Sequence, residues 1–140
     1  MKLISGGVCA AKGFRANGIH CGIRKNHAKK DLALIVSDVP AAAAAVYTTN
    51  LVKGAPLQVT KKNITDGKAQ AVICNSGNAN TCNANGIQIA EEMCDLTARK
   101  LGIKPSDVVV ASTGVIGQPL NLAPIAGGMD ALAEGLSYDG

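Results

Sequence analysis

The chain has 140 residues, the usual size of one domain, and we expect residues 1–140 to form a single domain. Its net charge is +4, but its basic clusters contain no interleaved aromatic residues and no nucleic-acid-binding motif, so we expect no nucleic-acid partner. No apolar stretch approaches the length of a membrane span, and the amino terminus lacks the apolar segment of a signal peptide. We therefore expect a cytoplasmic protein with no membrane partner.

The first half of the chain predicts more strand than helix. Strands are indicated at 14–21 (as a hairpin), 31–36 and 44–49, although the alanine-rich residues 41–45 would also suit a helix. Asn17-Gly18 is a typical hairpin turn, and Val39-Pro40 should end the second strand. A helix is predicted to begin at Pro56 and to end before Gly67.

The second half of the chain predicts a mixture of strands and helices. Strands are indicated at 70–74 and 107–111, and helices at 86–101 and 125–136. The helix at 86–101 is the clearest, because its apolar residues recur at helical spacing and Gly102 follows as a C-cap. Since strands and helices do not alternate strictly, we expect an α/β sandwich with helices packed on a sheet.

Aliphatic side chains must form nearly all of the core. The chain has no Trp, one Phe and two Tyr, so Ala, Val, Ile and Leu fill the interior. Each of these side chains buries little area, and close packing or a partner surface has to compensate.

Small polar residues follow two of the predicted strands. The stretch 75–80 reads Asn-Ser-Gly-Asn-Ala-Asn, and we expect Asn75 and Asn78 to hold an irregular loop around Gly77, although such amides can also bind a polar substrate. The stretch 112–117 reads Ser-Thr-Gly-Val-Ile-Gly after an apolar run. Backbone N–H groups that leave the ladder at such a turn can stabilise an oxyanion, and the alternative is a tight turn with no chemistry.

Several other chemistries find little support in the residues. No Lys follows Gly117, which excludes a phosphate-binding loop, and no Gly-x-Ser-x-Gly elbow is present. The only histidines, His20 and His27, have no nucleophile in a recognisable pattern with them. Five cysteines, an odd number with no Cys-x-x-Cys pair, argue against a disulfide framework or structural zinc, and a thiol or metal role for Cys74 and Cys82 is a weaker alternative.

Considered together, the motifs resemble the start of the ornithine acetyltransferase family, the bifunctional glutamate N-acetyltransferases of arginine biosynthesis. The likeness runs in order through essentially all of the chain. The segments that carry it are Gly6-Gly7-Val8, Ala11-Lys12-Gly13-Phe14, Cys21-Gly22-Ile23, Lys30-Asp31-Leu32-Ala33-Leu34, Ser37-Asp38, Val46-Tyr47-Thr48-Thr49-Asn50, Ala55-Pro56, 75–80 and 112–117. One departure follows Asn80, where the family usually reads Ala-Cys-Thr-Gly and this chain reads Thr81-Cys82-Asn83-Ala84.

The resemblance implies an N-terminal-nucleophile-like α/β sandwich, incomplete in this chain, which would be the amino-terminal α-chain part. Such enzymes transfer acetyl from N-acetylornithine to glutamate through an acetyl-threonine, and many also accept acetyl-CoA; no cofactor is expected. A precursor cleaves itself before the nucleophilic threonine, and the α and β chains stay together as an α2β2 heterotetramer. The nucleophile would belong to the β chain and is absent from this sequence.

The resemblance also assigns roles to particular residues. The Thr113 hydroxyl and the Gly114 N–H would form the oxyanion hole, while Ser112 and Gly117 would shape the turn around them. The chain would then supply the oxyanion donors without the nucleophile. A second hypothesis is a non-catalytic interaction module that needs a partner chain.

Overall fold

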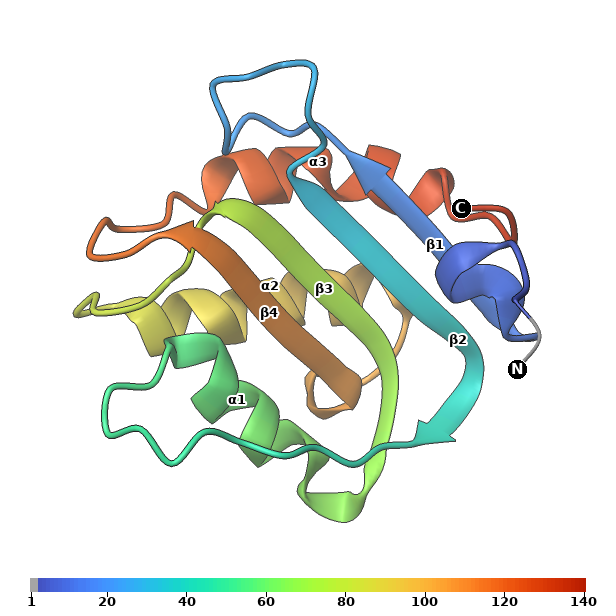
Figure 1. The fold of residues 1–140 in the computed structure, drawn as a ribbon, viewed down its shortest axis with the longest axis horizontal. Coiled ribbons are helices and arrows are strands. Elements are labelled where there is room, and N and C mark those ends of the chain that lie inside the picture. The colour runs from blue at the N-terminus through green and yellow to red at the C-terminus, as the bar shows by residue number, and fades with distance from the viewer. Residues whose placement is uncertain (1–2) are drawn as a thin grey trace.

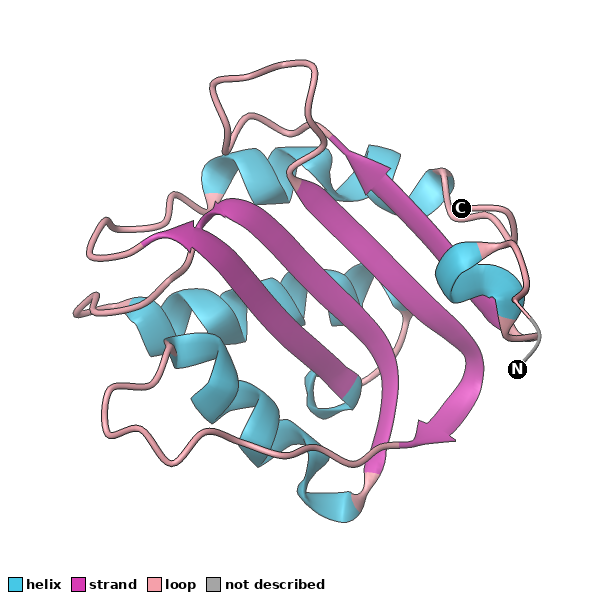
Figure 2. Ribbon diagram, viewed as in Figure 1, coloured by secondary structure: helices cyan, strands magenta, loops and turns pink. Residues whose placement is uncertain are grey.

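The computed structural model describes residues 3–140 as a four-stranded sheet with helices packed on one face and along one edge (Figure 1). Met1 and Lys2, which begin the amino-terminal segment assessed above, lie outside the described residues. The strands are β1 (Phe14–Ile19), β2 (Leu32–Ala42), β3 (Lys68–Asn78) and β4 (Val108–Val115), and the helices are α1 (Ala55–Asn63), α2 (Gly86–Leu101) and α3 (Ala123–Glu134). Short 3-10 turns lie at η1 (Gly7–Ala10), η2 (Ile64–Asp66) and η3 (Pro105–Asp107) (Figure 2).

The sheet is mixed, with the strand order β1-β2-β3-β4. β1 pairs with β2 and β2 with β3 in antiparallel fashion, whereas β3 and β4 are parallel. A parallel pair requires a crossover, and α2 supplies it between β3 and β4. The predicted arrangement, helices packed on a mixed sheet, is confirmed.

The core lies between the sheet and the helices. Alternate strand residues such as Leu34, Ile73 and Val110 point to the helices and are almost fully buried. Met93 of α2 and Ile125 of α3 pack against them and are equally buried. The aliphatic core expected from the composition is therefore present. The helix predicted at 86–101 coincides with α2, and Gly102 follows it as a C-cap in the left-handed conformation.

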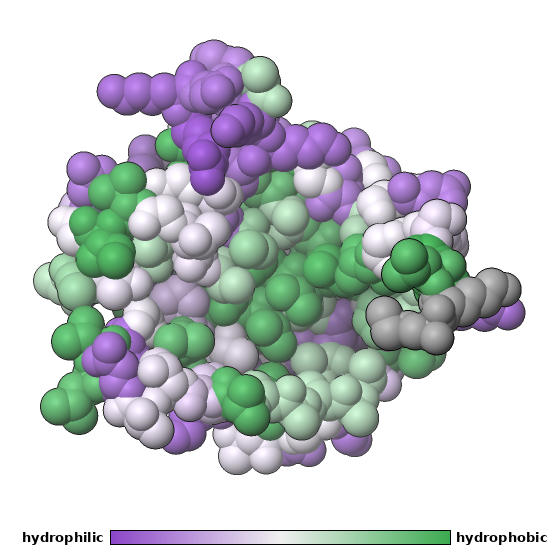
Figure 3. All heavy atoms as spheres, viewed as in Figure 1, coloured by the Kyte–Doolittle hydropathy of each residue, from purple (hydrophilic) through white to green (hydrophobic). Residues whose placement is uncertain are grey.

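None of the helices described within residues 3–140 covers the opposite face of the sheet. Small and apolar residues of the four strands gather there, and Figure 3 shows this apolar surface from the side that the helices leave uncovered. A shallow hollow of about 200 Å³ lies on it, with Phe14, Ile35, Val72 and Val109 in its lining. Within residues 3–140, none of the helices combines the length and the apolar character that crossing a membrane requires.

The predicted hairpin at 14–21 is wrong. Asn17 and Gly18 lie within β1 and pair with Leu34 and Ala33 of β2. The Asn17 amide donates to the carbonyl oxygens of Ala131 and Leu132 at 3.2 and 2.9 Å, so it anchors α3 to the edge of the sheet. A long-range partner has overridden the local turn preference of Asn-Gly.

The predicted end of the second strand at Val39-Pro40 is also wrong. β2 continues to Ala42, and its register with β3 shifts between Val36 and Ala41. Proline is tolerated at such an irregularity because no ladder bond is required from it there. The strand expected at 44–49 is absent, since residues 43–50 form a loop beside α1.

Candidate functional site

The first four residues of each of the two polar stretches, which were expected to form a loop and a turn, continue the preceding strand. β3 continues through Asn78 and β4 through Val115, and the bends begin only at residue 116. Asn75 therefore lies opposite Ser112, Ser76 opposite Thr113, and Gly77 opposite Gly114. Asn and Gly disfavour strands on their own, and pairing with a parallel neighbour outweighs that preference.

Gly77 and Gly114 form a glycine pair at the carboxyl ends of β3 and β4. Their φ angles are 114° and 132°, which L side chains rarely adopt. A Cβ on Gly114 would lie 2.6 Å from both the carbonyl oxygen of Gly77 and the amide nitrogen of Asn78. The backbones of the two strands therefore approach each other more closely than any side chain would permit.

β4 is an edge strand, and α1 covers the first part of its outer edge. The Thr60 hydroxyl donates to the Val110 carbonyl at 2.9 Å and accepts from the Val110 N–H at 3.1 Å. The Asn63 amide donates to the Val108 carbonyl at 2.9 Å. Because backbone groups alternate in direction along a strand, the N–H groups of Ser112 and Gly114 point to this same edge.

Thr113 and Gly114 are both exposed. No side chain of residues 3–140 accepts a hydrogen bond from the Gly114 N–H, and Thr113 lies on the uncovered face of the sheet beside Ser76. The two groups assigned to the oxyanion hole are therefore accessible at the end of β4. Their role in stabilising an oxyanion remains a prediction.

The asparagines at the end of β3 and just beyond it bond to backbone groups. Asn75 donates to the Asn78 carbonyl at 2.9 Å, and Asn78 donates to the Gln118 carbonyl at 2.9 Å. Asn78 also accepts from the Asn80 N–H at 2.8 Å, and Asn80 donates to the Gly86 carbonyl at 2.8 Å. These bonds fix the segments that follow β3 and β4 relative to the start of α2.

The turn after β4 and the segment after β3 also meet directly. Gly117 is exposed with φ 76°, and its N–H donates to the Thr81 carbonyl at 2.9 Å. Thr81 begins the stretch that departs from the family pattern, and the left-handed residues Asn80 and Cys82 lie on either side of it. The departure thus changes a loop beside the site and leaves Thr113 and Gly114 in their strand.

A cavity of about 230 Å³ adjoins the end of β4 on its helix side. Gly54 and Pro56 at the start of α1 line it with Thr81, Ala111 and Ser112. The Ser112 hydroxyl is buried and has no hydrogen-bond partner among residues 3–140. It is therefore an unused polar group at the wall of this cavity.

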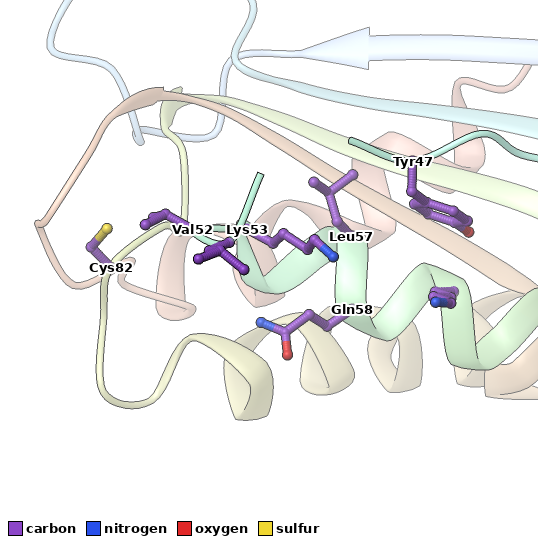
Figure 4. Close-up of a pocket in the computed structure, with 8 residues that line it drawn as sticks. Tyr47, Val52, Lys53, Leu57, Gln58 and Cys82 are labelled. Atoms are coloured by element: carbon purple, nitrogen blue, oxygen red, sulfur yellow. The ribbon is translucent and has the colours of Figure 1, made fainter. Parts of the chain in front are cut away.

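A cavity of about 510 Å³ lies between α1 and the loop that precedes it (Figure 4). No motif in the sequence pointed to it. Lys53 and Lys61 contribute two ammonium groups, the lining contains no carboxylate, and the Lys61 Nζ lies 6.0 Å from the centre of the Tyr47 ring. Leu57 lines both this cavity and the one beside Ser112, so the two are neighbours.

The structure does not bring the alternative catalytic candidates together into a site. His20 Nδ1 lies 3.1 Å from the Asp31 carboxylate, and its ring contacts His27 with the centres 4.8 Å apart. The Cys21 thiol bonds to the same carboxylate, but burial raises its pKa to about 11, so it is not activated as a nucleophile. Burial raises the pKa of the Cys74 thiol, whereas Cys82 is exposed. Across residues 3–140, no three His, Cys, Asp or Glu side chains are placed to hold a metal ion.

Sequence reasoning missed a link between Asp31 and the end of β3. The buried Asp31 carboxylate accepts the backbone N–H groups of Cys21 at 2.7 Å and Arg24 at 2.9 Å. The Arg24 side chain then reaches across to Ser76. Such contacts join residues far apart in the chain, and no local sequence pattern predicts them.

Known proteins with similar sequences and similar folds support the architecture described above. The ArgJ family profile matches residues 15–139. The arginine biosynthesis bifunctional protein ArgJ of Symbiobacterium thermophilum is 50% identical over 142 residues, covering 100% of this chain and 35% of that protein. The crystal structure of the ArgJ protein from Bacillus halodurans has a TM-score of 0.82 and 47% identity, covering 87% of this chain and 64% of that chain. The crystal structure of ornithine acetyltransferase with ornithine, from Mycobacterium tuberculosis, has a TM-score of 0.90 and 35% identity, covering 95% of this chain and 72% of that chain.

These matches confirm the family resemblance and the N-terminal-nucleophile-like fold expected from it. They also define how much of the relatives this chain represents. It covers 32–35% of the curated relatives, which is about a third of their length.

Proposed function

Because the chain belongs to the ArgJ family, we propose that it is the amino-terminal part of an acetyltransferase that moves acetyl from N-acetylornithine to glutamate. In this proposal the chain contributes the oxyanion hole. A threonine on a β chain contributes the nucleophile, and the two chains assemble as an α2β2 enzyme in the cytoplasm. Acetyl-CoA is the candidate second acetyl donor, and no cofactor takes part.

The observation that supports this proposal most directly is the placement of Thr113 and Gly114. Both are exposed at the end of β4, and the Gly114 N–H points to the edge that α1 leaves uncovered. A hydroxyl and an amide fixed at a strand end can donate to the oxygen that becomes negative when a carbonyl is attacked. Gly114 has no Cβ to obstruct the approach of that oxygen.

The proposed reaction has two halves. The threonine oxygen attacks the acetyl carbonyl, with its own amino group as base, and the Thr113 hydroxyl and Gly114 N–H hold the tetrahedral oxyanion. The C–N bond then breaks, ornithine leaves with a proton, and the acetyl group remains on the threonine. The glutamate amine attacks this ester through the same oxyanion hole, and the threonine is released as acetylglutamate forms.

The test is a transfer assay with isotopically labelled N-acetylornithine. The complete protein, or this chain co-expressed with the threonine-carrying chain, should produce labelled acetylglutamate and free ornithine. An acetylated threonine should be detectable by mass spectrometry when glutamate is omitted. A complete, folded protein that forms neither product would refute the proposal.

A second candidate function is that of a non-catalytic interaction module. The uncovered face of the sheet favours it, because the apolar residues Ile35, Val72 and Val109 lie around a hollow with no helix over them (Figure 3). This reading predicts that the 140-residue chain binds a partner chain but transfers no acetyl group by itself. Acetyl transfer by the purified chain alone would exclude it.

A further inference from the structure

We infer that Arg24 is a positioning residue for the proposed acetyl transfer, holding the end of β3 in the place that Gly114 requires. The inference rests on the proposed function, because its consequence is the orientation of the Gly114 N–H. No motif assigned a role to the Arg24 side chain, and it lies outside the strands and helices.

Asp31 fixes the backbone from which Arg24 projects. Its buried carboxylate accepts the N–H groups of Cys21, Gly22 and Arg24 at 2.7, 3.3 and 2.9 Å. The Asp31 carbonyl accepts the Ser76 N–H at 2.8 Å, so the same residue bonds to both the Arg24 loop and β3. The loop at 21–24 is therefore held rigidly beside the last residues of β3.

The half-buried Arg24 side chain contacts two consecutive residues of β3. Its Nε donates to the Ser76 hydroxyl at 3.0 Å, and its Nη2 donates to the same oxygen. Its Cγ covers Gly77 so closely that a Cβ there would lie 2.9 Å away. No carboxylate of residues 3–140 forms an ion pair with the guanidinium, so Ser76 is the group that orients it.

Gly77 lies between the Arg24 side chain and the predicted oxyanion hole. Arg24 packs on one side of Gly77, and Gly114 lies against its backbone on the other. Ser76 lies beside Thr113 in the same register, about one strand spacing away. A displacement of β3 at Ser76 and Gly77 would therefore move both predicted donors, and small misplacements of such groups lower turnover strongly.

The test compares variants of the complete acetyltransferase that carries this chain. Arg24→Gln keeps the Cγ that covers Gly77 but removes the paired guanidinium donors, and Ser76→Ala removes their acceptor. Each should lower kcat about tenfold while KM changes less than twofold, because substrate binding is not touched. The double variant should lose little more than either single variant, since both break one contact.

Two further variants separate positioning from charge or general destabilisation. Arg24→Lys keeps the stem over Gly77 and one donor. The decrease in the logarithm of kcat should therefore be smaller than in Arg24→Gln by at least about a third. Lys25→Gln removes the neighbouring exposed charge and should leave kcat and KM unchanged.

The outcomes are decisive in either direction. A raised KM with unchanged kcat, additive losses in the double variant, or wild-type kcat in Arg24→Gln would each overturn the inference. If the unsubstituted enzyme transfers acetyl normally, these results leave the proposed function standing. If the unsubstituted, folded enzyme transfers none, the proposed function fails first and the inference with it.

Discussion

Gly77 and Gly114 lie opposite each other in the parallel pair of β3 and β4, and both have a positive φ. The close approach of their backbones places Gly114 at the end of an exposed edge while tying it to the neighbouring strand. Any side chain at Gly114 would have to displace the backbone of Gly77 or Asn78.

Gly114→Ala should therefore destabilise the protein by about 2–5 kcal/mol, from backbone strain and the overlap with β3. Urea unfolding followed by circular dichroism measures the loss. Gly127→Ala is the matched control, because Gly127 lies in α3 with no atom near the added methyl group, and it should stabilise by up to about 1 kcal/mol. Equal free energies of unfolding for the two variants would contradict the close approach.

Thr60→Val tests the attachment of α1 to the edge of β4. The substitution keeps the shape but leaves the Val110 N–H and carbonyl without their partner in a buried place, which costs about 1–3 kcal/mol. Thr65→Val removes an exposed hydroxyl at the end of the same segment and should change stability by less than about 0.5 kcal/mol. The contact has little importance if both variants unfold at the same urea concentration.

The pH dependence of stability tests the role of Asp31. Burial acts to raise the pKa of its carboxyl, but hydrogen bonds from the Arg24 and Cys21 N–H groups outweigh burial and hold the pKa below the usual 3.8. A lowered pKa means that the ionised carboxylate stabilises the folded state fully only at pH values well above 3.8, and that this contribution is lost as the pH falls through 3.8 and then through the folded value.

We therefore expect the free energy of unfolding to decrease between pH 5 and pH 2 (a range set roughly by these pKa values), and we expect Asp31→Asn to flatten the decrease. Asp95→Asn, at an exposed position on α2, should leave its slope unchanged. Unfolding curves that fall equally steeply in wild type and Asp31→Asn would show that another group is responsible.

Thiol labelling tests the burial of the cysteines. Burial raises the pKa of Cys94 to about 12, and its side chain lies in the core, so it should react with iodoacetamide only after unfolding. Cys82 is exposed and should react at neutral pH in the folded protein. Mass spectrometry of labelled peptides distinguishes the two, and rapid labelling of Cys94 in the native protein would contradict the packing of α2.

The sequence was most informative where structure depends on near neighbours. The helix at 86–101 could be predicted because its apolar spacing and its C-cap at Gly102 are local signals. The Asn-Gly pair in β1, by contrast, is held in a strand by β2 and α3, which the local pattern could not indicate.

The same contrast between local and long-range determinants holds for the candidate site. Thr113 and Gly114 could be selected from a motif, but the strand that contains them could not, because its second half depends on pairing with Ser76 and Gly77. Arg24 was missed since its contact with Ser76 spans 52 positions in the chain. Residues that act through such distant contacts become visible only in three dimensions.

The proposed role of the Thr113 hydroxyl and the Gly114 N–H, to stabilise the oxyanion of acetyl transfer, can be tested by the kcat of Thr113→Ala in the complete enzyme. Thr113 is exposed, so the variant should fold normally. Loss of one oxyanion donor should lower kcat on the order of 10²-fold, with Thr113→Ser retaining most of the activity because it keeps the hydroxyl. Wild-type turnover by a correctly folded and processed Thr113→Ala enzyme would contradict the account.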